Sequence, residues 1–315
     1  MIWNQNVLRR PSGKLWPLRL AYRQAWMDTG RGVQDSILVA GVGRSGTTWL
    51  SEVLAASTKS REIFEPFIVR ADGNFALSPT NRADSTMGYR SNYSQFISPG
   101  VGRASSHHAE VGSILEGRIR SWWTEQGMVP GIYKRRVIKD IRANLMLGWL
   151  SDCWPALKII YVVRNPVSTV ASMLERSSSG WGFDWDPKFV LEQEVLMDGC
   201  LAPFRNILEA NHDHDARLML RWCVENYVAL NQLAGKTNIK LVSYDVLSKN
   251  PMSWKGIFEF IDWPFDEDRF AAQVKQQSRT AATGKGIESK KFRSGKERIT
   301  LLTKLVDQFG LDEYL

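Results

Sequence analysis

Residues 41–50, with the sequence GVGRSGTTWL, constrain the fold more than any other part of this chain. They directly follow the apolar run Ser36–Ala40 and lead into Thr47–Ser57, where apolar residues recur at helical spacing. Glycines let backbone N–H groups close around an anion at a helix N-terminus, where the helix dipole favours negative charge. This order of strand, loop and helix predicts an α/β protein with an anion-binding loop; a plain glycine turn is the alternative interpretation.

The loop differs from the nucleotide-triphosphate pattern G-x-x-x-x-G-K-[ST] at one position that matters. Gly41 and Gly46 match the pattern, but Thr47 stands where the pattern has its lysine. Without that lysine there is no clamp for the β- and γ-phosphates, so a P-loop kinase-like phosphotransferase is disfavoured and remains only the alternative enzyme. Arg44 places a cation within the loop instead.

Further apolar runs predict the rest of the architecture. They are short and rich in Ile, Val and Leu, and helix-like stretches such as Val167–Arg176 follow them. Uninterrupted runs of this kind suit a parallel sheet covered on both faces, built from right-handed βαβ units. We therefore expect a single α/β domain over residues 1–315, with a central, mostly parallel sheet flanked by helices. The expected strands are Ser36–Ala40, Arg136–Lys139, Leu157–Val163 and Ile239–Tyr244.

Composition limits the cellular compartments and the binding partners to be expected for this chain. Lys and Arg number 41 against 33 Asp and Glu, and the net charge of +8 suits an anionic partner. A nucleic-acid-binding module is the alternative from another class, but the basic residues do not form known base-stacking or groove-reading patterns. No apolar run reaches the ~18 residues of a membrane-spanning helix, and the chain begins without a signal-peptide layout. With three scattered cysteines, we expect a cytoplasmic, reduced protein without a transmembrane segment.

A second motif lies at the end of the third expected strand. In KIIYVVRNP the strand ends at Arg164, and Pro166 suits the first turn of the helix that carries Ser172. Eight residues span about 12 Å along a helix, so Arg164 and Ser172 meet one anion only if the chain turns between them. An arginine at the strand end, followed by a turn, provides that geometry. Paired with the glycine loop, this otherwise weak motif becomes specific.

Gly43–Leu50 together with Arg164–Ser172 resembles the two cofactor motifs of the sulfotransferases that use 3′-phosphoadenosine-5′-phosphosulfate (PAPS). In that family the first motif holds the 5′-phosphosulfate and the second holds the 3′-phosphate. The resemblance implies in-line transfer of a sulfuryl group to a hydroxyl, amine or guanidine of a small-molecule or carbohydrate acceptor. It assigns the 5′-phosphate to Arg44, Ser45, Gly46, Thr47 and Thr48, the adenine to Trp49, and the 3′-phosphate to Arg164 and Ser172.

Other stretches extend the resemblance to roughly residues 36–295. The sequence LVSYDVL looks like the family's late strand and implies that Tyr244 approaches the adenine. Within the basic stretch 276–298, residues 291–295 resemble the loop that closes on the 3′-phosphate. Residues 1–32 are expected to form an N-terminal arm, and 73–108 an acceptor-side insert or lid. The closing loop adds four cofactor residues, which are Lys291, Phe292, Arg293 and Gly295.

The catalytic base is where the sequence departs from the cytosolic members. Those carry a histidine two residues after a strand-end lysine, whereas Lys139 is followed by Asp140 and Ile141. The stretch IFEPF looks instead like carbohydrate-type and bacterial members, in which a glutamate before proline lies near the acceptor. This resemblance implies that Glu65 is the general base. A surface carboxylate remains the alternative for Glu65, and His107-His108 is the competing base.

Charge must also be stabilised on the leaving oxygen of a sulfuryl transfer, as in phosphoryl transfer. An SO₃ group carries less negative charge than a phosphoryl group, so side-chain cations suffice and no metal is expected. Arg44 and Lys139 are the candidates, with a solvated strand-end lysine as the alternative for Lys139. Residues 212–215 (HDHD) have metal-ligand types at close spacing, but a turn with an Asp N-cap explains them better.

The segment SGWGFDWD, residues 179–186, is the candidate acceptor loop. It follows the helix that carries Ser172. Aromatic faces and carboxylates suit a cationic or polyhydroxylated acceptor. The alternative is that the aromatic residues fill a core and the aspartates cap the helix near Pro187. The alternating residues are Trp181, Phe183 and Trp185, with Asp184 and Asp186.

Overall fold

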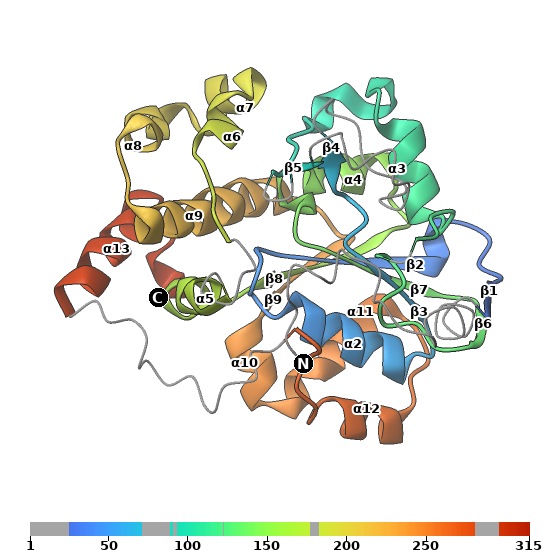
Figure 1. Ribbon diagram of the computed structural model, residues 1–315. Coiled ribbons are helices and arrows are strands. Elements are labelled where there is room, and N and C mark those ends of the chain that lie inside the picture. The colour runs from blue at the N-terminus through green and yellow to red at the C-terminus, as the bar shows by residue number, and fades with distance from the viewer. Residues whose placement is uncertain (1–24, 71–88, 91–92, 122, 177–182, 281–295) are drawn as a thin grey trace, which may run out of the picture.

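The computed structural model describes residues 25–70, 89–90, 93–121, 123–176, 183–280 and 296–315. Its centre is a five-stranded sheet in the order β3-β7-β2-β8-β9, in which every pairing is parallel (Figure 1). The predicted α/β class with a central parallel sheet flanked by helices is confirmed. The strands are β2 (Ser36–Ala40), β3 (Arg61–Phe64), β7 (Arg136–Asp140), β8 (Lys158–Val163) and β9 (Ile239–Ser243).

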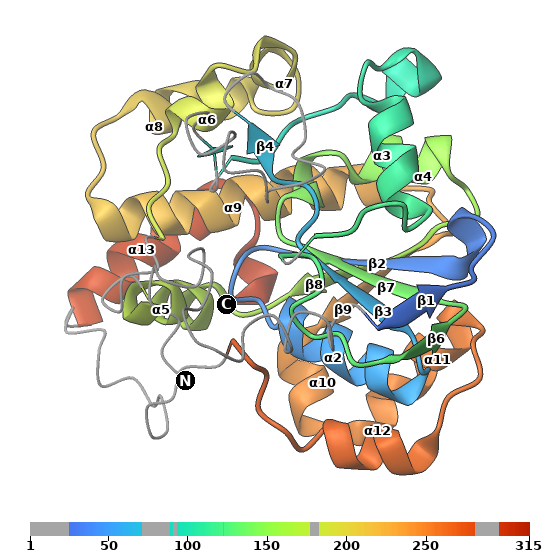
Figure 2. The ribbon, with the colours of Figure 1, turned by 45° about the vertical axis from the view of Figure 1, so that its right-hand side comes forward.

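Helices cover both faces of this sheet (Figure 2). Because side chains alternate along a strand, Ile37 and Val39 of β2 enter one buried cluster while Leu38 and Ala40 enter the other. One face packs on α2 (Thr47–Ser57), α10 (Tyr244–Lys249), α11 (Lys255–Ile261) and α12 (Glu267–Gln273). The other packs on a larger set, which includes α3 (His108–Leu115), α4 (Leu147–Cys153), α5 (Pro166–Arg176), α9 (His214–Leu233) and α13 (Lys296–Gln308).

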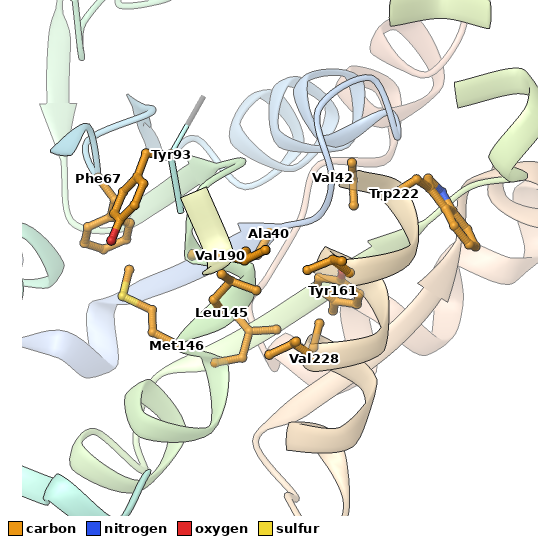
Figure 3. Close-up of a cluster of buried hydrophobic side chains, with 14 of the residues drawn as sticks. Ala40, Val42, Phe67, Tyr93, Leu145, Met146, Tyr161, Val190, Trp222 and Val228 are labelled. Atoms are coloured by element: carbon orange, nitrogen blue, oxygen red, sulfur yellow. The ribbon is translucent and has the colours of Figure 1, made fainter. Parts of the chain in front are cut away.

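The larger cluster joins the sheet to helix α9. Figure 3 shows part of it, where Ala40 and Tyr161 of the sheet lie near Val228 of α9. The remaining elements are β1 (Trp26–Asp28), η2 (Val33–Asp35), β4 (Val69–Arg70), β5 (Tyr89–Arg90), η4 (Pro99–Ala104), β6 (Gly131–Tyr133), η5 (Ala143–Leu145), α6 (Lys188–Leu191), α7 (Glu194–Asp198), η7 (Ala202–Phe204), α8 (Arg205–Glu209), η8 (Pro251–Trp254) and η9 (Asp312–Tyr314).

Strand β3 is an element that the apolar pattern does not predict. The first two of its four residues, Arg61 and Glu62, are charged, yet all four residues are buried. Arg61 pairs with Asp28 at 2.9 Å, and paired charges allow a strand of mixed polarity to be buried. The expected strand Ser36–Ala40 has the bounds of β2, and each of the other three expected strands differs at one end by one residue; for example, Tyr244 begins α10 instead of ending β9.

Parts of the predicted arm, insert and closing stretch, and of the candidate acceptor loop, lie outside the described residues. The arm 1–32 is described from residue 25, where β1 pairs with β6 in parallel. The insert 73–108 is described only at 89–90 and from 93, and the stretch 276–298 only up to 280 and from 296. Within the described ranges, no helix combines the length and the apolar character needed to cross a bilayer. The four closing-loop residues outside these ranges are Lys291, Phe292, Arg293 and Gly295.

Candidate active site

The carboxyl ends of the parallel strands bring the candidate residues to one edge of the sheet. The glycine loop follows β2, Glu65 follows β3, and Lys139 is the penultimate residue of β7. Arg164 follows β8, and Tyr244 follows β9. Segments that are far apart in the sequence therefore meet at a single site.

Two glycines of the loop sit where a side chain does not fit. Gly46 has a left-handed φ of 96°, and a Cβ atom there would lie 2.1 Å from the Tyr244 ring. At Gly41, with φ 154°, a Cβ atom would lie 2.5 Å from the Val162 carbonyl oxygen. The loop is therefore pressed between β8 and α10 as it turns into α2. Because its N-cap Gly46 has no side chain, the first N–H groups of α2 are not capped from that position.

Three arginines from separate segments meet beside the loop. Arg44 Nε donates to Ser172 Oγ at 3.0 Å, and Arg164 Nη1 donates to the Arg44 carbonyl oxygen at 3.1 Å. Burial, followed by the charges of Arg176 and Arg164, lowers the pKa of Arg44 to about 10, although Glu175 acts in the opposite direction. Such a cluster favours an anionic ligand. Motif reasoning missed Arg176, although it follows Ser172 by one helical turn.

Two buried polar atoms at the loop have no hydrogen-bond partner among the described residues. They are Ser45 Oγ, on a residue 1% exposed, and Arg164 Nε. Buried polar groups are normally satisfied, so these two atoms have hydrogen-bonding capacity left for a ligand. Together with the arginine cluster and the glycine loop, they fit a phosphate-bearing molecule.

A distant segment, which we call the strap, crosses the loop from Val274 to Thr280. Trp49 Nε1 donates to the Val274 carbonyl oxygen at 3.3 Å. At its other end, the Thr280 carbonyl oxygen accepts from Arg44 Nη1 at 3.0 Å and also from Arg176. The strap therefore supplies an acceptor to the arginine cluster itself.

Arg279 fastens the strap to α2 and β3. Its Nη1 atom pairs with Glu62 at 2.6 Å and with Glu52 at 3.1 Å. Burial raises the pKa of Glu52 to about 7, with Glu62 adding to the effect and Arg279 opposing it. One guanidinium thus holds two carboxylates at the edge of the site.

The two aromatic residues expected near adenine contact each other. The rings of Trp49 and Tyr244 meet edge to face with centroids 5.6 Å apart, and Trp49 meets Trp254 at 5.2 Å. The Arg164 guanidinium lies 4.8 Å from the centroid of the Tyr244 ring. This aromatic group therefore borders the arginine cluster on the α2 side of the sheet.

A second charged cluster joins the ends of β3 and β7. Glu65 is 7% exposed and has a left-handed φ of 44°. Lys139 Nζ donates to its Oε1 atom, and Arg142 Nη1 donates to its Oε2 atom at 3.0 Å. Burial acts to raise the pKa of Glu65, but the charges of Lys139 and Arg142 outweigh it and lower that pKa to about 2. Burial lowers the pKa of Lys139.

Arg142 and Asp140 are candidates that motif reasoning missed. The Asp140 carboxylate accepts from the Arg142 N–H at 2.6 Å and from the Phe67 N–H at 2.8 Å. It therefore fixes the segment after β7 against the segment after β3. Burial raises the pKa of Asp140 to about 6 despite Arg142. The available signal was the charged run at residues 139–142, directly after an apolar strand.

The histidines considered as an alternative base or as metal ligands make other contacts. The His108 ring stacks on Trp154 at 4.7 Å, just beyond the end of α4. Asp213 accepts from the Ala216 N–H at 3.0 Å, so the predicted N-cap is confirmed. His214 pairs with Asp184 at 3.5 Å. In the part of the chain that the structure describes, no three His, Cys, Asp or Glu residues are grouped to hold a metal.

Some residues of the candidate acceptor loop fit the structural interpretation, and one lies beside the site. Trp185 is 2% exposed and belongs to the core, and Asp186 Oδ1 accepts from the Lys188 N–H at 3.0 Å at the start of α6. Phe183 instead lies over the glycine loop, where a Cβ atom on Gly43 would be 3.2 Å from its ring. Trp181 lies outside the described residues.

A glycine loop, an arginine cluster and a buried carboxylate at the carboxyl ends of the strands characterise an α/β protein with a site suited to an anionic ligand. The model of the sulfotransferase family matches residues 36–267, and the chain belongs to this family. A search of the curated proteins finds no match.

Several solved structures are similar to the chain at low identity. A mouse sulfotransferase, SULT7A1, complexed with PAP is 13% identical over 92% of this chain and 86% of its own, with a TM-score of 0.41. A sulfotransferase from Alicyclobacillus acidocaldarius is 14% identical over 88% and 95%, with a TM-score of 0.40. STF1 from Mycobacterium tuberculosis is 13% identical over 94% and 80%, with a TM-score of 0.41. Membership of the family rests on the family model alone.

Proposed function

We propose that this sulfotransferase uses PAPS and acts in the cytoplasm on a hydroxyl, amine or guanidine of a small-molecule or carbohydrate acceptor, with no nucleic-acid partner. The observation that carries the proposal is the cluster of Arg44, Arg164 and Arg176 beside a glycine loop with an unsatisfied Ser45 Oγ. Several guanidinium groups around one loop suit a ligand with more than one phosphate-type group.

The cofactor residues divide by position around the loop. Loop N–H groups at the α2 N-terminus would hold the 5′-phosphosulfate, and the arginines after β8 and on α5 would hold the 3′-phosphate. When bound, PAPS supplies the sulfuryl group and leaves as adenosine 3′,5′-bisphosphate (PAP). The proposed residues are Arg44, Ser45, Gly46, Thr47 and Thr48 for the 5′ end, Trp49 and Tyr244 for adenine, and Arg164, Ser172, Arg176, Lys291, Phe292, Arg293 and Gly295 for the 3′ end.

The chemistry is assigned to the two charged clusters. Glu65 takes the proton of the acceptor, and Lys139 with Arg44 stabilises the negative charge that develops on the leaving oxygen. These side chains act without a metal ion. Phe183 lies over Gly43 and forms part of the acceptor site.

The test of this assignment compares two ligands that differ only at the 3′ position. Arg164→Ala should weaken PAP binding by ~2 kcal/mol or more, because a charge-assisted contact is lost. AMP, which lacks the 3′-phosphate, should bind the wild type and the variant similarly in calorimetric titrations. Arg205→Ala, on the exposed side of α8, is the control and should change neither affinity. Equal weakening of both ligands would show that Arg164 does not hold the 3′-phosphate.

A further inference from the structure

The cation assigned to the leaving oxygen is already engaged in this structure. The Lys139 side chain is 3% exposed, its Nζ atom donates to Glu65 Oε1, and it lies 4.5 Å from the centroid of the Phe64 ring. The Glu65 N–H also donates to the Lys139 carbonyl oxygen at 2.6 Å, so strand pairing holds the two residues together. Lys139 therefore already gives a donor and its buried charge to Glu65, and an anionic cofactor must compete with that carboxylate for it.

The same pairing keeps Glu65 from acting as a base. A carboxylate that two cations hold in its ionised form accepts a proton poorly. The charged groups that face Glu65 are Lys139 and Asp140 on β7, Arg142 just after it, and Arg279 on the strap. Of these, Lys139 contacts Oε1 and Arg142 contacts Oε2. Removal of Lys139 alone would uncover one oxygen and leave the other anchored.

We propose that the Lys139–Glu65 ion pair is a latch that the anionic cofactor opens, with Arg142 as the positioning residue that keeps Glu65 in place. This inference rests on the proposed function. Lys139 leaves Oε1 for the phosphosulfate, and Glu65 keeps its contact with Arg142. Glu65 Oε1 then receives the acceptor proton while the acceptor oxygen or nitrogen bonds to sulfur. The bond from sulfur to the bridging oxygen breaks, and its electron pair stays on the leaving phosphate.

The latch couples the readiness of the base to the presence of the cofactor. Without an anion in the loop, the most favourable partner for a buried Lys139 is Glu65. A ligand that carries phosphate charge competes for Lys139 and so raises the proton affinity of Glu65. The base is therefore active only in the loaded enzyme.

The decisive measurement is the affinity for PAP, which requires no turnover. Glu65→Gln removes the competitor for Lys139, so it should tighten PAP binding about tenfold in calorimetric titrations. In a Lys139→Gln background the same substitution should give no gain, because the cation that benefits is absent. Glu125→Gln, a buried and paired carboxylate elsewhere in the fold, is the matched control and should leave the affinity unchanged.

Other outcomes separate the latch from the proposed function. If Glu65→Gln binds PAP as the wild type does, or more weakly, the latch is wrong even though PAP binds. If the wild type does not bind PAP, the proposed function itself fails. Glu65→Asp provides a second variant if Glu65→Gln does not fold, because Asp tolerates the left-handed backbone. Its shorter side chain should give a smaller gain in affinity, and no gain would also refute the latch.

Discussion

At the scale of single residues, the site uses backbone conformations that most residues avoid. Arg44, with φ 73°, and Glu65, with φ 44°, have left-handed backbones without being glycine. Such conformations cost about 1–3 kcal/mol and persist only where surrounding contacts fix them. Ser172 and Thr280 hold the Arg44 side chain, while Lys139 and Arg142 hold that of Glu65. Backbone strain is thus found at the two proposed centres of chemistry.

Gly46→Ala tests the fit of the loop. A methyl group there would strike the Tyr244 ring, so we expect a loss of about 1–3 kcal/mol in the free energy of unfolding and weaker PAP binding. Thermal unfolding and calorimetry measure the two effects. Gly310→Ala is the control, because φ is 64° there but a Cβ atom would meet nothing within 4 Å. It carries the left-handed strain without the clash, so it should lower stability less than Gly46→Ala does and leave PAP affinity as it is; equal effects in both variants would contradict a specific clash.

Arg142 should set the pH range in which Glu65 works. Its loss removes a cation that favours the carboxylate, so Arg142→Gln should raise the pKa of Glu65. The acidic limb of kcat at saturating PAPS should move up by about one pH unit or more. Arg142→Lys, which keeps the charge, should restore much of the wild-type profile. A lower kcat with an unshifted limb in Arg142→Gln would indicate a purely structural role.

At the scale of elements, sheet order explains what the sequence could and could not predict. Local patterns predict the loop after β2 and the arginine after β8, because each motif is contiguous. The contact between Glu65 and Lys139 spans 74 residues and exists because β3 lies beside β7. Strand β3 is too short and too charged to be predicted from the pattern of apolar residues. Arg142 and Arg176 were missed because their partners come from other strands and loops.

Helix α2 and the strap share a pH-sensitive contact at Glu52. The pKa of Glu52 in the folded protein, about 7, lies above its ordinary value of 4.5. The free energy of unfolding therefore decreases as the pH rises from 4.5 to 7, because the ionised carboxylate is disfavoured in the folded state. Glu52→Gln should therefore raise the free energy of unfolding by about 1–2 kcal/mol at pH 8 and change it little at pH 5. Thermal unfolding at both pH values measures this. Glu116→Gln, at a surface ion pair, is the control; a gain at pH 5 as large as at pH 8 would argue against Glu52 titration.

At the scale of the whole molecule, Asp28 connects the amino ends of the strands, opposite the carboxyl ends at which the site lies. This residue of β1 accepts from Arg136 at 2.7 and 2.8 Å and from Arg61 at 2.9 Å. It therefore joins β1 to β3 and β7, the two strands that carry Glu65 and Lys139 at their other ends. Although burial opposes it, the hydrogen bonds from both arginines lower the pKa of Asp28.

Asp28→Asn should leave the buried Arg136 guanidinium without its counter-charge and Arg61 with only the more distant carboxylate of Glu125, at 3.6 Å. We expect a loss of about 3–5 kcal/mol in the free energy of unfolding at pH 7, measured by denaturant titration. In the wild type, the contribution of Asp28 is present above pH 3.8 and disappears as the pH falls through the lowered pKa. Asp152→Asn, at a partly exposed pair with Lys236, should cost much less. Similar losses of stability in the two variants would show that Asp28 contributes no more than a surface ion pair.

The Thr280 carbonyl oxygen in the arginine cluster makes the folded chain selective before any ligand is recognised. A molecule that takes these two guanidinium donors replaces hydrogen bonds already made, so it gains there only if its own acceptor is stronger than a peptide carbonyl. Phosphate oxygens meet that requirement, whereas the hydroxyl groups of an uncharged nucleoside do not. Under the proposed function, we therefore expect adenosine to bind much more weakly than PAP, even where its base fits the aromatic residues.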